Sequence, residues 1–156
     1  MKKEDEIERY LESSTNQEKK LILAAKKKCA PNAKMTPIRE MIYLIILRYP
    51  KGIKAYQLLE MVKEVKPLAT PPTIYRVLDF LTARKIITKC HSNHTFMSIT
   101  NNRSGEKVVL SCPLCKTSTI INDSQTITSL STLFMEQGYI LNKKNNSIKI
   151  ICSKCQ

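Results

Sequence analysis

The chain has 156 residues, enough for one ordinary domain or two small ones, and 26 Lys and Arg against 13 Asp and Glu give it a formal net charge of +13. A surplus of this size favours a polyanionic partner, either nucleic acid or an acidic membrane surface. The sequence shows no nucleophile–base pair, carboxylate dyad or phosphate-binding loop and has only three glycines, which argues against an enzyme and a small-molecule substrate.

The sequence also argues against a membrane or secreted protein. No apolar run approaches the length of a membrane span. The charged start, Met1-Lys-Lys-Glu-Asp-Glu6, lacks the apolar stretch of a secretory signal. We therefore expect a cytoplasmic protein with reduced cysteines and no membrane contact.

The first half of the sequence carries the patterns of four helices. A capping box at Thr15-Asn-Gln-Glu18 opens the first of them, and Thr36-Pro37 places an N-cap and a proline before the second. Apolar residues at helical spacing define the third and fourth. The expected helices cover residues 15–29, 38–49, 55–65 and 73–84. The sequence leaves open whether residues 1–14, with Ile7, Tyr10 and Leu11, form a further helix.

Two short runs at 86–90 and 95–99 flank the polar turn 91–94 and predict a β-hairpin. Helices followed by such a hairpin indicate a winged helix-turn-helix domain, which we place at residues 1–99. The polar stretch 100–105 is the expected hinge.

Residues 106–156 predict a small α+β domain. Its strands are expected at 107–111 and 117–122, its helix at 126–136 with Gly138 as the C-cap, and a second hairpin at 139–141 and 147–151 around Asn145-Asn146. The fold class is therefore α+β, with a winged helix-turn-helix domain followed by this smaller one. Exposed strand edges and a single helix cannot easily bury themselves, so we expect the small domain to dimerise.

Two Cys-x-x-Cys pairs stand in the second domain, Cys112-Pro-Leu-Cys115 and Cys152-Ser-Lys-Cys155. Two such pairs supply four thiolates at a spacing that suits one tetrahedral Zn²⁺, and a closed shell of sulfurs leaves no position for water or substrate. We therefore predict one structural zinc per protomer. The alternative is two redox-active or disulfide pairs, although a redox Cys-x-x-Cys would not need a matching second copy.

The segment Pro71-Pro-Thr-Ile-Tyr-Arg-Val-Leu-Asp-Phe-Leu81 leads into the fourth expected helix and forms most of it. Its N-terminus is the positive end of the helix dipole and can meet a phosphate. Thr73 can hydrogen-bond the backbone, while Tyr75 and Arg76 lie away from the apolar stripe. The guanidinium of Arg76 has the fork that reads guanine in the major groove. The alternative is an amphipathic helix whose arginine is merely solvated.

This segment resembles the DNA-recognition helix of the ferric uptake regulator family, whose members carry a motif like P-[PT]-T-[VI]-Y-R-x-L. Thr36-Pro-Ile-Arg39 is similar to the family's T-P-Q-R, and Gly138-Tyr139 is similar to the G-F or G-Y before its last hairpin. Both cysteine pairs match the family's structural zinc site. Ala55-Tyr56 and Pro71-Pro72 together resemble the zinc uptake regulator branch.

The resemblance implies a homodimeric transcription repressor that binds a double-stranded DNA operator. Carried over by position, Tyr75 and Arg76 would contact bases, and Tyr56 would approach the DNA near the third helix. The structural zinc would be held by Cys112, Cys115, Cys152 and Cys155. Phosphate contacts would come from lysines such as Lys34, Lys51, Lys54, Lys85 and Lys89.

The chain departs from the family where a second, metal-sensing site is expected near the hinge. Thr88 and Ile99 stand where the wing would supply ligands, Lys107-Val108-Val109 replaces a histidine-rich stretch, and Ile120-Ile121 falls where a glutamate is common. A lysine at such a place adds charge repulsion as well as removing a donor. We therefore expect a degenerate sensory site and DNA binding that needs no added metal signal.

Two alternatives stay open from the sequence. Cys90, His91 and His94 offer three ligands of suitable type for a non-standard wing site, which would make the chain a genuine zinc-responsive repressor. A surface turn with two solvated imidazoles and a half-buried thiol is the simpler interpretation of the same residues. The chain could also be a protein-interaction module that pairs with a related regulator.

Overall fold

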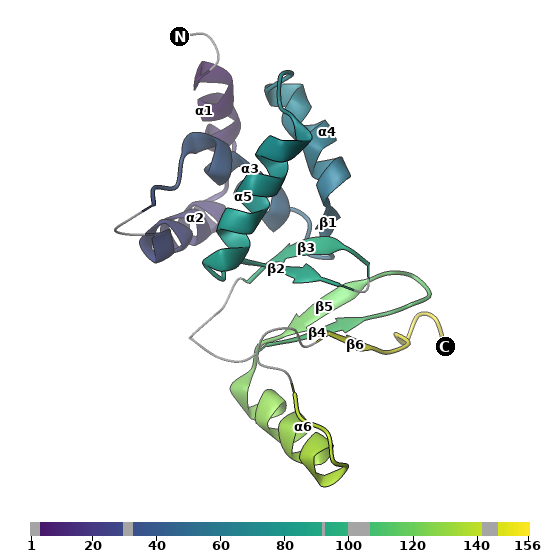
Figure 1. Ribbon diagram of the computed structural model, residues 1–156. Coiled ribbons are helices and arrows are strands. Elements are labelled where there is room, and N and C mark those ends of the chain that lie inside the picture. Colours follow the sequence, from purple (N-terminus) through teal and green to yellow (C-terminus); the bar gives the residue numbers. More distant parts are fainter. Residues whose placement is uncertain (1–3, 30–32, 92, 100–106, 142–146) are drawn as a thin grey trace. The chain divides into compact units, whose positions relative to one another are not determined.

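A computed structural model describes residues 4–29, 33–91, 93–99, 107–141 and 147–156 (Figure 1). Six α-helices and six β-strands are present among these residues, which confirms the predicted α+β class. The contacts divide the chain into two compact units: residues 1–89 with 95–100, and residues 90–94 with 101–156. In the described part of the chain, no helix combines the length and apolar character that crossing a bilayer requires.

The first unit is built around one buried helix, α3 (Pro37–Leu47). Every residue from Met41 to Ile46 is buried, and four other helices contact α3. The unit also contains a three-stranded sheet in the order β1-β3-β2, with Ile53 of β1 opposite Phe96 of β3. The other elements are α1 (Glu4–Glu12), α2 (Asn16–Cys29), β1 (Ile53–Lys54), α4 (Ala55–Val65), α5 (Pro71–Ala83), β2 (Ile87–Cys90) and β3 (Thr95–Ser98).

Residues 4–12 form a helix, which answers the question that the sequence left open. Ile7 on this helix is buried in the core. The predicted capping box is confirmed, because Thr15 N donates to Glu18 Oε2 at 2.6 Å and Glu18 N donates to Thr15 Oγ1 at 3.2 Å. Arg48, the C-cap of α3, donates to Glu18 Oε1 at 2.9 Å and to the carbonyl of Ser13 at 3.2 Å. The Arg48 guanidinium therefore lowers the pKa of Glu18 and joins the α1–α2 turn to the end of α3.

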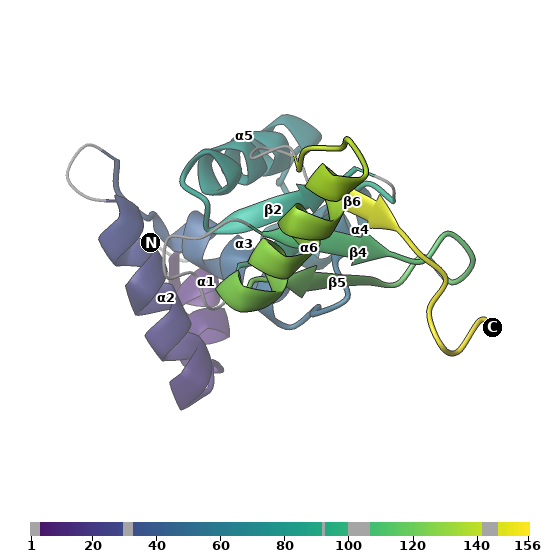
Figure 2. The same ribbon diagram turned by 90° about the horizontal axis from the view of Figure 1, so that it is seen from below.

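The second unit contains the sheet β5-β4-β6 and one helix. Strand β4 (Val108–Ser111) pairs antiparallel with β5 (Ser118–Ile121) and parallel with β6 (Ser147–Lys149). Helix α6 (Ser124–Glu136) lies on one side of this sheet and crosses in front of it when seen from below (Figure 2). It begins two residues before the predicted start because the Asp123 side chain caps it, accepting from Thr126 N at 2.7 Å.

The predicted hairpin at 139–141 and 147–151 is wrong. Residues 139–141 form no strand, and β6 pairs in parallel with β4 instead, with Ile148 opposite Leu110. This pairing satisfies the second edge of β4, which an isolated hairpin would leave exposed. The expected turn residues Asn145 and Asn146 lie outside the described residues, and so does the expected hinge at 100–105.

Two glycines with positive φ allow a matched stability test. Gly52 has φ +91, and a Cβ there would lie 2.6 Å from Oγ1 and 2.8 Å from Cβ of the buried Thr95. Gly138 has φ +80 at the end of α6, and a Cβ there would meet nothing within 4 Å. We expect Gly138→Ala to cost about 1 kcal/mol, the backbone penalty alone.

Gly52→Ala should cost about 2–4 kcal/mol, because it adds a steric clash against β3 to the same penalty. Urea unfolding followed by circular dichroism would measure both variants. Equal losses in the two variants would contradict the close approach of Gly52 and Thr95.

Candidate metal centre and nucleic-acid interface

The topology of the second unit brings the two cysteine pairs together. Cys112 directly follows β4, and Cys152 follows β6 by a few residues. Because β4 and β6 run parallel, their C-terminal ends lie at the same edge of the sheet. The Ile150 N–H extends this alignment by donating to the Ser111 carbonyl at 3.0 Å. The parallel pairing that the sequence did not predict is thus the feature that assembles the cysteine site.

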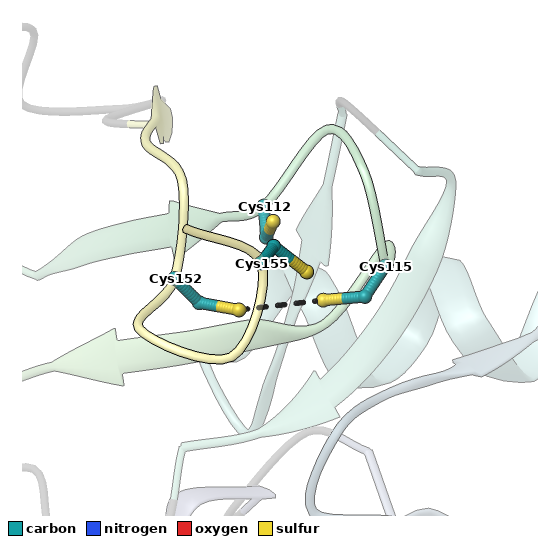
Figure 3. Close-up of side chains that lie close together, drawn as sticks. All are labelled: Cys112, Cys115, Cys152 and Cys155. Atoms are coloured by element: carbon teal, nitrogen blue, oxygen red, sulfur yellow. Dashed lines mark hydrogen bonds between the residues drawn. The ribbon is translucent and has the colours of Figure 1, made fainter.

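The four thiol groups point toward one another (Figure 3). All four Sγ atoms lie within 4.8 Å of each other, and Cys115 Sγ and Cys152 Sγ are 3.6 Å apart. A tetrahedral Zn²⁺ with Zn–S bonds of about 2.3 Å requires sulfurs about 3.8 Å apart. The donor set and its spacing therefore fit zinc, and four sulfurs fill its coordination shell.

The surroundings of the thiols favour ionisation of two cysteines and oppose it at a third. Backbone N–H groups of Cys115 and Cys152 lower the pKa of Cys112 to about 6, and the Thr117 hydroxyl, 3.3 Å from Cys115 Sγ, lowers that of Cys115. Hydrogen bonds with the Cys152 and Cys115 thiols raise the pKa of Cys155 to about 12. Four adjacent thiolates repel one another, and a divalent cation at their centre would remove that repulsion.

The second site candidate is the outward face of α5. Tyr75 is 53% exposed, and Arg76 beside it is exposed, whereas Ile74, Val77 and Leu78 are buried in the core. Among the described residues, the Arg76 side chain has no hydrogen-bond or ion-pair partner. The guanidinium is therefore available for an external acceptor.

The structure places the other two predicted DNA contacts at helix N-termini in the same unit. Tyr56 in the first turn of α4 is 58% exposed, and Lys54 Nζ lies 5.9 Å from the centre of its ring. Thr73 is half-buried, and its hydroxyl lies 3.1 Å from that of Thr70, the N-cap of α5. The Thr73 hydroxyl thus links the first turn of α5 to its N-cap residue. The predicted phosphate-contact lysines Lys34, Lys51, Lys54, Lys85 and Lys89 are all exposed.

The structure does not bring the predicted wing metal ligands together. Cys90 is fully buried, whereas His91 and His94 are exposed. Within the described ranges, the only group of three or more potential metal ligands is the four-cysteine set. Of the residues at the expected sensory positions, Thr88, Ile99, Val108 and Val109 are buried, whereas Lys107, Ile120 and Ile121 are half-buried.

The family model of the ferric uptake regulators matches residues 30–117. The chain belongs to the ferric uptake regulator family. The match spans α4, α5, the β2–β3 hairpin and the first cysteine pair, so it covers the exposed faces of α4 and α5 and half of the four-cysteine site.

The most informative relatives are zinc uptake regulators. The zinc uptake regulation protein of Escherichia coli K12 is 36% identical over 88 residues, which is 56% of this chain and 50% of the relative. The chain thus spans about half the length of that relative. A solved zinc uptake regulator in complex with zinc and DNA has a TM-score of 0.70 at 26% identity, over 91% of this chain and 96% of the other. The holo form of XcZur has a TM-score of 0.65 at 28% identity, over 86% and 95% of the two chains.

Sequence reasoning overlooked Asn93, which lies in the turn between β2 and β3. Its carboxamide nitrogen donates to the Lys116 carbonyl and to Ser118 Oγ, both at 2.8 Å. Its partners lie 23 and 25 residues further along the chain, so no local pattern marked it.

The four-cysteine geometry makes a direct prediction for metal content. Cys152→Ser should remove the tightly held zinc and lower the unfolding midpoint of the second unit, since a hydroxyl cannot replace a thiolate in a sulfur shell. Metal analysis of the purified protein and thermal unfolding would measure both effects. Cys29→Ala, which changes a buried thiol in the first unit, is the control and should keep the zinc. Retained zinc in Cys152→Ser would contradict the assignment.

Proposed function

We propose that this chain is a sequence-specific DNA-binding regulator of transcription, a repressor that acts as a homodimer on a double-stranded operator. The observation that carries the proposal is the exposed pair Tyr75 and Arg76 on the outward face of α5. Family membership supports it, as does the similarity to a zinc uptake regulator solved with zinc and DNA. The winged-helix part at residues 1–99 would bind DNA, and residues 106–156 would form the dimer.

The recognition chemistry follows from the exposed groups of α4 and α5. The Arg76 guanidinium can donate two hydrogen bonds to guanine O6 and N7 in the major groove, and the Tyr75 ring can contact a neighbouring base. The first turn of α4 can offer backbone N–H groups to a phosphate. Helix α5 begins with Pro71 and Pro72, which have no N–H, and the Thr73 N–H donates to the Thr70 carbonyl, so its N-terminus would attract a phosphate through the helix dipole alone. Exposed lysines around them and the net charge of +13 would supply affinity without specificity.

The four cysteines would hold one structural zinc per protomer. Cys112, Cys115, Cys152 and Cys155 supply all four ligands, so a bound zinc would act as a cross-link of the second unit. It would fix the segment after β6 to the turn between β4 and β5. Catalytic chemistry is not expected from such a closed shell.

The second unit offers an apolar surface for a homodimer. Helix α6 and the segments on either side of β6 expose large apolar side chains, and Ile140 is the most exposed of them at 87%. The others are Leu133, Met135, Tyr139, Ile150 and Ile151. A second copy of the chain would cover this surface and shield the outer edges of the sheet.

The sensory site is the point at which we propose that this chain differs from its relatives. Threonine and aliphatic side chains stand at most of the expected ligand positions, and the described residues contain no second group of three or more potential metal ligands. The wing cysteine and histidines do not converge either, which speaks against a zinc-responsive repressor that senses metal through Cys90, His91 and His94. We therefore propose operator binding that needs only the structural zinc.

Arg76→Ala tests the recognition face. We expect a loss of about 1–3 kcal/mol in operator binding together with reduced discrimination against a mutated operator, because one bidentate base contact is removed. Fluorescence anisotropy with both DNAs would measure it. Arg9→Ala removes an equivalent exposed charge from α1 and should leave the discrimination intact. If both variants lose the same affinity on every DNA, Arg76 contacts phosphate only.

A chelator that spares the four-cysteine zinc tests the degenerate sensory site. We expect operator affinity to stay within about twofold of the untreated value, whereas raising salt from about 50 to 200 mM should weaken it by about a thousandfold. Zinc content per protomer would be measured on the same samples. Two zincs per protomer, with the second raising affinity, would show that a sensor exists.

A further inference from the structure

The turn that closes the β2–β3 hairpin packs with the second unit. Residues 90–94 belong to the same compact unit as the cysteine site, whereas β3 and most of β2 belong to the first. Asn93 in this turn is a polar residue with only 8% of its surface exposed. A buried carboxamide is expected to be tightly hydrogen-bonded, because leaving it unpaired would be costly.

The bonds of Asn93 lead directly to the first cysteine pair. Its Nδ2 donates to the carbonyl of Lys116, the residue that follows the ligand Cys115. Lys116 has a left-handed backbone with φ 61, and its own N–H donates to the Cys112 carbonyl at 3.0 Å. The Lys116 peptide thus closes the turn of the cysteine pair on one side and accepts from Asn93 on the other.

A second branch of the network reaches β5. Asn93 Nδ2 also donates to Ser118 Oγ, and the Ser118 hydroxyl donates to Cys90 Sγ at 3.5 Å. Ser118 and Cys90 are both buried, so these bonds are shielded from water. Asn93 in the hairpin turn is therefore joined to Lys116, which follows the cysteine pair, and to Ser118, which begins β5; Cys90 at the end of β2 is joined to Ser118.

We propose that Asn93 is a positioning residue that transmits the order of the four-cysteine metal site to the β2–β3 hairpin. Resting on the function proposed above, this inference gives the structural zinc a second task. The metal orders the Cys112–Lys116 turn, the Lys116 carbonyl holds Asn93, and Asn93 holds the turn of the wing. Operator binding then depends on the structural site, while no sensory metal is required.

Asn93→Asp is the decisive variant. The carboxylate has the shape of the amide but no N–H, so an oxygen would face the Lys116 carbonyl where a donor lies now. In the full-length, zinc-loaded protein we expect unchanged zinc content and unchanged dimerisation. Amide hydrogen exchange in residues 87–98 should rise about tenfold, and operator affinity should fall about tenfold, as expected for the loss of a buried hydrogen bond.

His91→Ala is the matched control, since His91 is exposed and lies in the same turn. It should leave exchange in residues 87–98 and operator affinity unchanged. Ser118→Ala is a second variant. It removes the bond from Asn93 to Ser118 and keeps the bond from Asn93 to Lys116, so we expect exchange in residues 87–98 between that of the wild type and that of Asn93→Asp. If the amides of residues 87–98 exchange in Asn93→Asp at the same rate as in the wild type, the proposal is overturned.

Zinc removal in both the wild type and Asn93→Asp tests whether the metal and Asn93 act through the same route. An asparagine that only stabilises its own turn would give independent effects. Stripping the zinc with a strong chelator should accelerate exchange in residues 87–98 of the wild type and add nothing further in Asn93→Asp. Equal acceleration in both proteins would overturn the coupling. Wild-type protein that binds no operator would refute the proposed function, and the exchange cycle would still decide whether Asn93 links the two turns.

Discussion

The second unit depends on the convergence of four thiols because it has little apolar core of its own. Among the described residues, the main core cluster extends along the chain no further than Phe96. The sheet β5-β4-β6 and α6 bury a few aliphatic side chains, chiefly Val108, Val109 and Ile127. A region of this size needs a further constraint to hold one conformation, and a metal bound by four sulfurs supplies it. The parallel pairing of β4 and β6, the turns of the two Cys-x-x-Cys pairs and the hydrogen bonds of Asn93 all surround that one centre.

The sequence predicted the parts of the protein whose signals are local. The capping box at Thr15–Glu18, the helix start at Thr36-Pro37 and the Cys-x-x-Cys pairs are short patterns with direct physical causes, and each led to the right element. The partner of β6 was missed because strand pairing depends on edges that are distant in the chain. Asn93 was missed for the same reason: its partners become neighbours only after folding. The wing histidines were a plausible ligand pair by residue type, but the structure exposes both and buries the cysteine beside them.

The first unit shows the opposite balance, since it has a large apolar core around α3. Helix α3 is surrounded on every side, and Arg48 at its end joins α1 and α2 to it through Glu18 and Ser13. In this arrangement the inward faces of α4 and α5 pack into the core, and their outward faces are exposed. Tyr56, Tyr75 and Arg76 can therefore be exposed at little cost in stability, as the proposed recognition surface would require. Their positions are fixed by buried neighbours such as Ile74 and Leu78, which makes the surface rigid before any ligand arrives.

The 37-residue separation between Cys115 and Cys152 has a consequence for biosynthesis. A chain emerges from the ribosome from its N-terminus, and its domains generally fold as units in that order. The first unit, apart from its turn at residues 90–94, can fold as soon as it has emerged, but the sulfur shell cannot close until the segment after β6 has followed. During that interval Cys112 and Cys115 form an incomplete pair that is open to oxidation or to the wrong metal. Rapid synthesis of the intervening segment and a ready supply of zinc would therefore matter most at this late stage of the protein's maturation.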